Sequence, residues 1–128
     1  MKIKTFTYAL AAVFGLIGPA LFLRNINLSD WGMLIGSSVL ALWLLSPFVL
    51  MALAIRSDRF SAIGALIATI LAGLFGAWFY TELTFHFYTR SDAQDAIAML
   101  FVAAYQHAII VLTLGLASIV GWLKTRRK

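Results

Sequence analysis

The sequence predicts an all-α integral membrane protein, a four-helix antiparallel bundle with both termini on the cytoplasmic side. Three observations predict it. Hydrophobic residues make up 62% of the chain and charged residues only 12%, and a soluble chain this short cannot bury so much apolar surface. Four long apolar runs are separated by short polar connections, and Lys and Arg are distributed unevenly between these connections.

The four runs cover residues 5–23, 31–55, 60–80 and 96–123 of a single domain, 1–128. Each reaches the roughly 20 helical residues that cross a bilayer core. The connections at 24–30 and 81–95 are predicted to lie outside. The first run also resembles a signal peptide, because Lys2 and Lys4 precede it. Apolar residues continue beyond its small-residue segment at 18–20, so we interpret it as an uncleaved helix.

Most of the basic residues fall on one predicted side, and they are Lys2, Lys4, Arg56, Arg59, Lys124, Arg126, Arg127 and Lys128. Short loops rich in Lys and Arg remain in the cytoplasm. The sequence therefore predicts a multi-pass protein of the inner (plasma) membrane, with the lipid bilayer as a partner. Nucleic-acid binding is not expected, because no basic stripe alternates with exposed aromatic residues.

The first and third runs share a short echo, LAAVFG at 10–15 and LAGLFG at 71–76. A Ser-Asp pair follows each, at 29–30 and 91–92, and both pairs are typical helix caps, since Ser and Asp accept hydrogen bonds from free helix N–H groups. Two tandem helical hairpins would explain the echo. A chance match within the small alphabet of apolar helices would explain it as well.

The second run contains Pro47, which cannot donate a backbone hydrogen bond and crowds the preceding turn. We therefore expect a kink there. Ser46 is placed to donate to a carbonyl that the proline leaves without a partner.

The third run carries small residues at every fourth position. Between helices in lipid the hydrophobic effect gives little drive, so small residues mark close helix contacts. We expect packing within the chain, with a seam between two copies as the alternative. The residues are Gly64, Ala68, Ala72 and Gly76.

The fourth run places Tyr105, Gln106 and His107 near mid-membrane, with Thr113 further along the same stripe. Intramembrane polar groups are costly and are functional candidates by default. Hydrogen bonding between helices is the first interpretation, above all for Gln106. A contact surface for a partner's helix or the lining of a pathway is the more specific alternative. No charged residue lies inside a span core, which argues against proton-coupled transport.

The connection at 81–95 is both acidic and aromatic, and it is a candidate for recognising a partner from outside. The aromatic residues are more simply explained as a belt at the membrane interface. No recognised metal-ligand spacing is present, and we predict neither a metal nor another cofactor. The candidate recognition residues are Glu82, His86, Asp92 and Asp95.

The leading functional hypothesis is a small membrane protein that acts through protein–protein interaction in or just outside the bilayer. Immunity to a membrane-active toxin and an accessory subunit of a membrane complex both fit. The alternative is a small channel or transporter formed by self-association. Enzyme activity is not expected, because the sequence offers no nucleophile–base pair, phosphate loop or paired acids.

Overall fold

The computed structural model describes residues 2–24, 31–57, 59–89 and 93–126, without the side chains of 31, 33, 86–89 and 93–96. All regular structure in these ranges is helical: α1 (Lys2–Arg24), α2 (Trp31–Arg56), α3 (Ala62–Thr89) and α4 (Ala93–Arg126). Each helix contains a segment long and apolar enough to cross a membrane. The predicted all-helical class with four apolar helices is confirmed.

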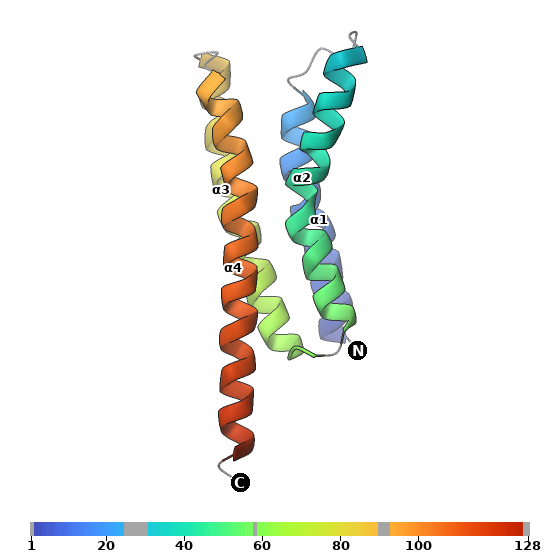
Figure 1. The fold of residues 1–128 in the computed structure, drawn as a ribbon, viewed down its shortest axis with the longest axis vertical. Coiled ribbons are helices and arrows are strands. Elements are labelled where there is room, and N and C mark those ends of the chain that lie inside the picture. The colour runs from blue at the N-terminus through green and yellow to red at the C-terminus, as the bar shows by residue number, and fades with distance from the viewer. Residues whose placement is uncertain (1, 25–30, 58, 90–92, 127–128) are drawn as a thin grey trace.

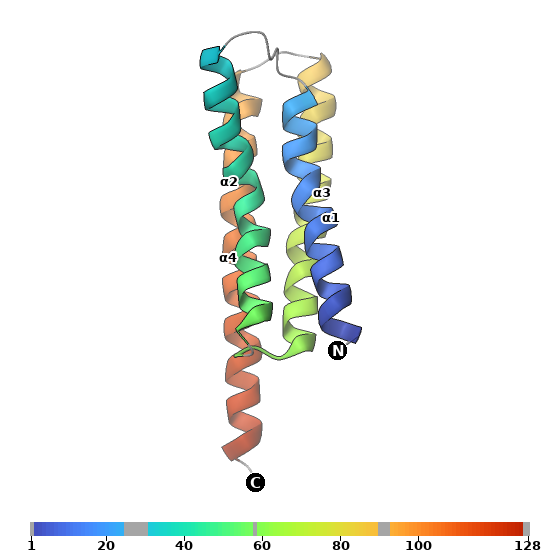
Figure 2. The ribbon, with the colours of Figure 1, turned by 90° about the vertical axis from the view of Figure 1, so that its right-hand side faces the viewer.

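The four helices form an elongated bundle (Figure 1). α1 packs against α2 and α3, and α4 packs against α3 and α2. α2 and α3 touch less, and α1 and α4 make no close contact within the described residues. The order around the bundle is therefore α1, α2, α4, α3, which a turned view also shows (Figure 2). The labelled ends of the chain both lie at the end of the bundle where α2 connects to α3.

The helix bounds differ most from the predicted spans at the end of α3. The helix continues past Tyr80 to Thr89, and α4 begins at Ala93, so most of the expected 81–95 loop is helical. No Gly or Pro occurs between 81 and 92, and the hydroxyls of Thr81 and Thr84 donate back to the carbonyls four residues earlier. Hydropathy marks where a helix leaves lipid, whereas breakers and caps decide where it ends.

The interior consists of two apolar clusters stacked along the bundle. The cluster nearer the chain ends combines residues of α2, α3 and α4, and includes Met51, Ala68 and Ile110. The other surrounds Tyr80 and includes Leu44 and Met99. Between lipid-exposed helices such contacts rest on close packing, because lipid is as apolar as the side chains themselves.

Glycines allow the closest helix approaches. A Cβ at Gly18 of α1 would lie 2.8 Å from the Tyr80 ring, and one at Gly64 would lie 2.7 Å from the Ala117 Cβ. A Cβ at Gly15 would meet Phe48 and Leu45 of α2, and one at Gly76 would meet Gln106 of α4. Leu45 and Gln106 each lie thirty positions after their glycine. Gly15 and Gly76 end the two copies of the sequence echo.

α4 is the longest helix, with 34 residues, and extends beyond α2 and α3 at its C-terminal end (Figures 1 and 2). α3 begins at Ala62, and Gly64 in its first turn lies beside Ala117. Every described residue of α4 from 118 to 126 is exposed. Ser61 caps α3 by accepting a hydrogen bond from the Gly64 N–H at 3.0 Å. The last turns of α4 are therefore exposed and extend past the start of α3 (Figure 1).

Candidate functional site

Gln106 lies in the α3–α4 interface and is 1% exposed. Its Nε2 donates to the Ala72 carbonyl oxygen at 2.9 Å, and its Oε1 accepts from the Tyr80 hydroxyl at 3.2 Å. Both ends of the buried amide are thus bonded to α3, which removes most of the cost of placing it away from water.

Gly76 makes room for this amide. It is buried directly opposite Gln106, and a Cβ at this position would overlap the Nε2 atom. The small-residue row of α3 lies against α4 in this region: Ala68 and Ala72 are fully buried, and Gly64 lies against Ala117.

We expect Gly76→Ala to lower the free energy of unfolding by about 1–2 kcal/mol, because the displaced amide loses a hydrogen bond to α3. Unfolding in mixed detergent micelles, followed by circular dichroism, measures this change. Gly115→Ala is the matched control, since no atom lies within 4 Å of a Cβ at that exposed position. An equal response of the two variants would contradict the steric role of Gly76.

His107 faces α2 rather than α3. Its Nδ1 is 2.8 Å from the Ala103 carbonyl oxygen on its own helix, and its Nε2 is 3.2 Å from Ser46 Oγ on α2. The imidazole also stacks on the Trp43 ring, with 5.3 Å between ring centroids and 24° between planes. Trp43 in turn donates from Nε1 to the Leu100 carbonyl oxygen at 3.0 Å, so it binds α4 twice.

The Ser46 hydroxyl replaces a backbone hydrogen bond that the following proline cannot make. Pro47 lacks the N–H that would bond the Trp43 carbonyl four residues earlier. The Ser46 hydroxyl donates to that carbonyl at 2.6 Å. The predicted partner for a freed carbonyl is confirmed.

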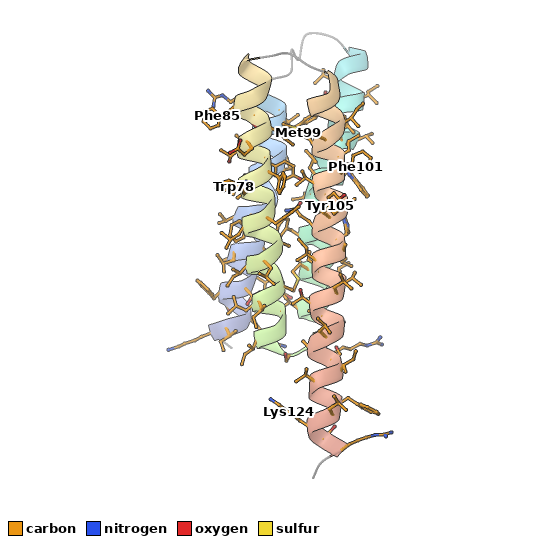
Figure 3. All side chains as sticks on the ribbon, turned by 90° about the vertical axis from the view of Figure 1, so that its left-hand side faces the viewer. Trp78, Phe85, Met99, Phe101, Tyr105 and Lys124 are labelled. Carbon is orange, nitrogen blue, oxygen red and sulfur yellow. The ribbon has the colours of Figure 1, made fainter. Side chains whose placement is uncertain are left out.

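The structure separates the three consecutive residues of the predicted polar stripe, whereas Thr113 lies on the α3 side of α4 as Gln106 does. Gln106 faces α3, His107 faces α2, and Tyr105 is 60% exposed on the outer surface (Figure 3). Tyr105 packs its ring edge against Phe75, with centroids 6.1 Å apart. Thr113 is half-buried near the α3 N-terminus. Consecutive residues of a helix point about 100° apart, so Tyr105, Gln106 and His107 form no single surface.

Two residues of this centre are absent from the sequence-based site. No sequence feature marks Trp43 as a site residue, because it is one aromatic residue within an apolar run. Tyr80 is the last residue of the third predicted run, yet it is 2% exposed and bonds Gln106. Its signal was present: Tyr80 and Thr84 continue the four-residue spacing of the small-residue row of α3, and both are buried.

The outer recognition residues are described only in part. Glu82 is exposed on the last turns of α3. Asp92 and the side chains of His86 and Asp95 lie outside the described residues. Within the described part of the chain, no group of three or more His, Cys, Asp or Glu residues is placed to hold a metal ion.

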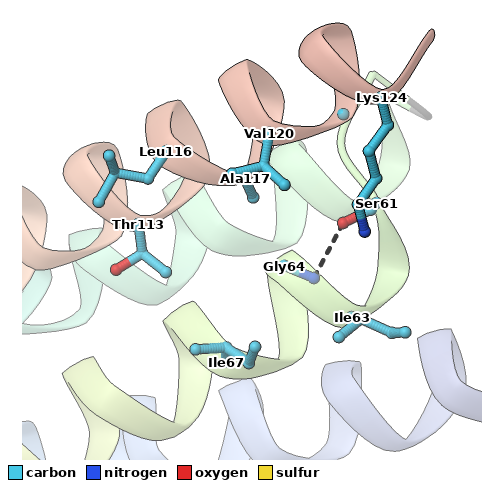
Figure 4. A pocket seen from close by; sticks show the side chains of 10 residues that line it. Ser61, Ile63, Gly64, Ile67, Thr113, Leu116, Ala117, Val120 and Lys124 are labelled. Atoms are coloured by element: carbon cyan, nitrogen blue, oxygen red, sulfur yellow. Dashed lines mark hydrogen bonds between the residues drawn. The ribbon is translucent and has the colours of Figure 1, made fainter. Parts of the chain in front are cut away.

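A groove of about 500 Å³ lies between the start of α3 and the projecting end of α4. Figure 4 shows Thr113, Ala117 and Lys124 along its α4 wall, with Ser61 and Gly64 opposite. Its other lining residues are mostly apolar, namely Ile63, Ile67, Leu116, Val120 and Gly121. Small residues line both walls of this groove, where α4 leaves the bundle.

Comparison with protein-family models, curated proteins and solved structures finds no match to this chain. By the length and composition of its helices, the chain belongs to the class of multi-pass membrane proteins.

Proposed function

We propose that this chain is a small inner-membrane protein that acts by binding another membrane protein. It would form an antiparallel bundle with both termini in the cytoplasm, and the projecting end of α4 would hold the partner. An immunity protein against a membrane-active toxin and an accessory subunit of a larger complex both fit this mode of action.

The observation that carries the proposal is the length of α4. Its apolar segment covers 30 residues, against 23 or 24 in each of the other helices. At 1.5 Å per residue it is about 45 Å long, whereas the hydrocarbon core is about 30 Å thick. The excess includes the exposed side chains of Ile119, Trp122 and Leu123, beyond the start of α3. Large exposed apolar surfaces outside lipid mark interaction sites.

Charge supports the cytoplasmic assignment of this end. The described basic residues that gather here are Lys2, Lys4, Arg56, Arg59, Lys124 and Arg126. The Arg126 guanidinium lies 4.0 Å from the centroid of the Trp122 ring, a cation–π contact typical of the membrane interface. A segment of the partner that packs beside these residues would gain from acidic groups near its own membrane boundary.

The recurrent glycine contacts support a duplicated architecture. Under a tandem duplication α1 corresponds to α3 and α2 to α4. Gly15 faces Phe48 and Leu45, and Gly76 faces Gln106, so one of the two contacts of Gly15 falls at the position equivalent to Gln106. In this proposal the second hairpin has gained a polar side chain where the first kept an apolar one.

The alternative, a homo-oligomeric channel or transporter, receives less support from the geometry. Gln106 and His107 would line its pathway, yet both side chains are bonded to groups of their own chain. Tyr105 is exposed but packs within an apolar surface of Phe75, Phe79 and Phe101.

We expect Gly121→Leu to reduce partner capture about tenfold, because a bulky side chain in a close helix contact costs on the order of 1–3 kcal/mol. A mild-detergent pull-down from native membranes, analysed by native mass spectrometry, measures the stoichiometry. Gly115→Leu is the matched control: both glycines are exposed on α4, but only Gly121 lines the groove.

If native mass spectrometry finds only copies of this chain and no other subunit, the channel or transporter alternative would be favoured. Equal capture by the two variants would remove the α4 groove as the binding surface. A protein that exerts its biological effect alone in lipid vesicles would contradict the interaction proposal as a whole.

A further inference from the structure

The groove between the start of α3 and the projecting end of α4 has the cross-section of a single extended chain. It follows α4 from Thr113 to Lys124, about 16 Å at 1.5 Å per residue, and its volume is about 500 Å³. Its mean cross-section is therefore roughly 30 Å², whereas a helix about 10 Å across needs roughly 80 Å². Non-bonded carbon atoms pack about 4 Å apart, so one extended acyl chain needs roughly 20 Å². The groove thus admits an acyl chain or protruding side chains, but not the body of a helix.

The groove is apolar along its walls and polar at the end where α4 leaves the bundle. Ile67, Leu116 and Val120 line the walls. At the polar end, the Lys124 side chain points back along α4 toward Ser61 (Figure 4). This direction is usual for a helical side chain, because the Cα–Cβ bond tilts toward the helix N-terminus. A ligand that fills the groove is therefore amphipathic, with its polar group near Lys124 and Ser61.

The charge at the polar end of the groove is positive. Glu82, the one carboxylate among the described side chains, lies in the last turns of α3, far along that helix from Ser61. In the sequence, segments 1–4, 56–59 and 124–128 of this end carry eight basic residues against one acid, Asp58, which lies outside the described residues. Lysine binds phosphate groups as a point charge. The polar group of the ligand is therefore expected to be an anion.

Ser61 adds a hydrogen-bond donor beside this charge. Its Oγ accepts from the Gly64 N–H at 3.0 Å, and within the described residues its own hydrogen has no acceptor. A serine hydroxyl can accept and donate at once, so Ser61 can donate to a phosphate oxygen while it caps α3. Basic pockets between membrane-spanning helices are typical sites for the headgroups of anionic lipids.

We propose that this groove binds one anionic phospholipid, with its phosphate at Lys124 and Ser61 and one acyl chain along α4. Bulk lipid touches every exposed helix without regard to its headgroup, so selection for a negative headgroup is what defines the site. A side chain of the proposed partner that enters the groove would take the place of the acyl chain. The lipid site is a property of the chain alone and does not depend on that partner.

The test uses the full chain, purified without a partner, in nanodiscs of equal parts phosphatidylglycerol and phosphatidylcholine with the same acyl chains. Native mass spectrometry counts the lipids that stay with each chain when the nanodisc is released. We expect one phosphatidylglycerol per chain and about a fivefold preference over phosphatidylcholine, the contribution of one lysine near an anionic surface. Retention that does not favour phosphatidylglycerol, or no retained lipid, overturns the proposal.

Lys124→Gln tests the headgroup contact. We expect the preference for phosphatidylglycerol to fall about fivefold, which leaves the two lipids nearly equal. Arg126→Gln is the matched control, because it removes the same charge from the same helix but points about 200° away from Lys124. Its guanidinium lies 4.0 Å from the centroid of the Trp122 ring, outside the groove. An equal loss of preference in the two variants would show a diffuse effect of net charge and overturn the proposal.

Gly121→Leu tests the position of the acyl chain. Both Gly121 and Gly115 are exposed, and no atom lies within 4 Å of a Cβ at either, so both variants should fold. Only Gly121 lines the groove. We expect Gly121→Leu to lower retained phosphatidylglycerol about tenfold and Gly115→Leu to keep it; equal retention overturns the proposal. Because no partner is present, a failure here leaves the partner proposal standing, and failed partner capture leaves the lipid site standing.

Discussion

Replacement of Gln106 by Leu should lower the free energy of unfolding by about 2 kcal/mol, because it leaves a buried hydroxyl without an acceptor. The Tyr80 hydroxyl donates to Gln106 Oε1, and the tyrosine is almost fully buried. Leucine resembles glutamine in volume, so the loss would come mainly from hydrogen bonding rather than from a cavity. Unfolding in mixed micelles, monitored by circular dichroism, measures it.

A double-mutant cycle isolates this contact. Tyr80→Phe removes the donor, so the combination with Gln106→Leu leaves no unpaired hydroxyl and should recover about 1 kcal/mol relative to the sum of the single losses. Ser118→Ala is a control on the same helix: the Ser118 hydroxyl bonds only the Leu114 carbonyl of its own helix, and its loss should change stability by less than about 0.5 kcal/mol. Strictly additive losses for Gln106 and Tyr80 would show that the two side chains are not energetically coupled.

Sequence reasoning succeeded where the cause is local. Pro47 lacks its N–H whatever surrounds it, so the adjacent Ser46 was expected to bond a freed carbonyl, and it does. The number of apolar helices was equally predictable, because a membrane-spanning segment needs a long apolar run and little else. Such statements depend on a few neighbouring residues or on composition.

The direction of each polar side chain depended on information outside its own helix. Helical periodicity placed Gln106 and Thr113 on one stripe of α4, but it did not say which neighbour that stripe would meet. In the structure α4 packs between α3 and α2, so Gln106 and His107 contact different helices, and Tyr105 lies on the outer surface against Phe75 of α3. The rotation of α4 follows from complementary shapes, above all the space at Gly76, and that complementarity is a property of pairs of helices.

Tyr80 shows how a single boundary can hide a site residue. Because hydropathy falls after Tyr80, the predicted third span ends at this residue, which places it at the membrane edge. The continuing helix instead places it at a junction of three helices, over Gly18 of α1 and beside Gln106 of α4. The four-residue spacing of small residues on α3 continues to Tyr80 and Thr84, beyond the apolar run. This spacing indicates the buried position of Tyr80 better than the end of the apolar run does.

Gly73→Ala should lower the free energy of unfolding by about 2–3 kcal/mol, the usual cost of overpacking a tight contact. A Cβ at this buried position of α3 would overlap three atoms of the Phe14 ring on α1. The ring has little freedom to withdraw, because it also stacks on Phe48 of α2, with centroids 6.4 Å apart. One methyl group would therefore disturb contacts among three helices. Thermal unfolding in a mild detergent, followed by circular dichroism, measures the loss.

The sign of the change in unfolding free energy on Gly→Ala substitution distinguishes a packing effect from a helix-propensity effect. Alanine favours a helix over glycine by about 1 kcal/mol in water, so Gly36→Ala, with no atom within 4 Å of the added Cβ, should leave stability unchanged or slightly raised. Phe14→Leu provides the second check, because a smaller side chain opens space for the new methyl group. The double variant should lose less than the sum of the single losses. If Gly73→Ala were as stable as Gly36→Ala, α1 and α3 would not approach each other as closely as the bundle requires.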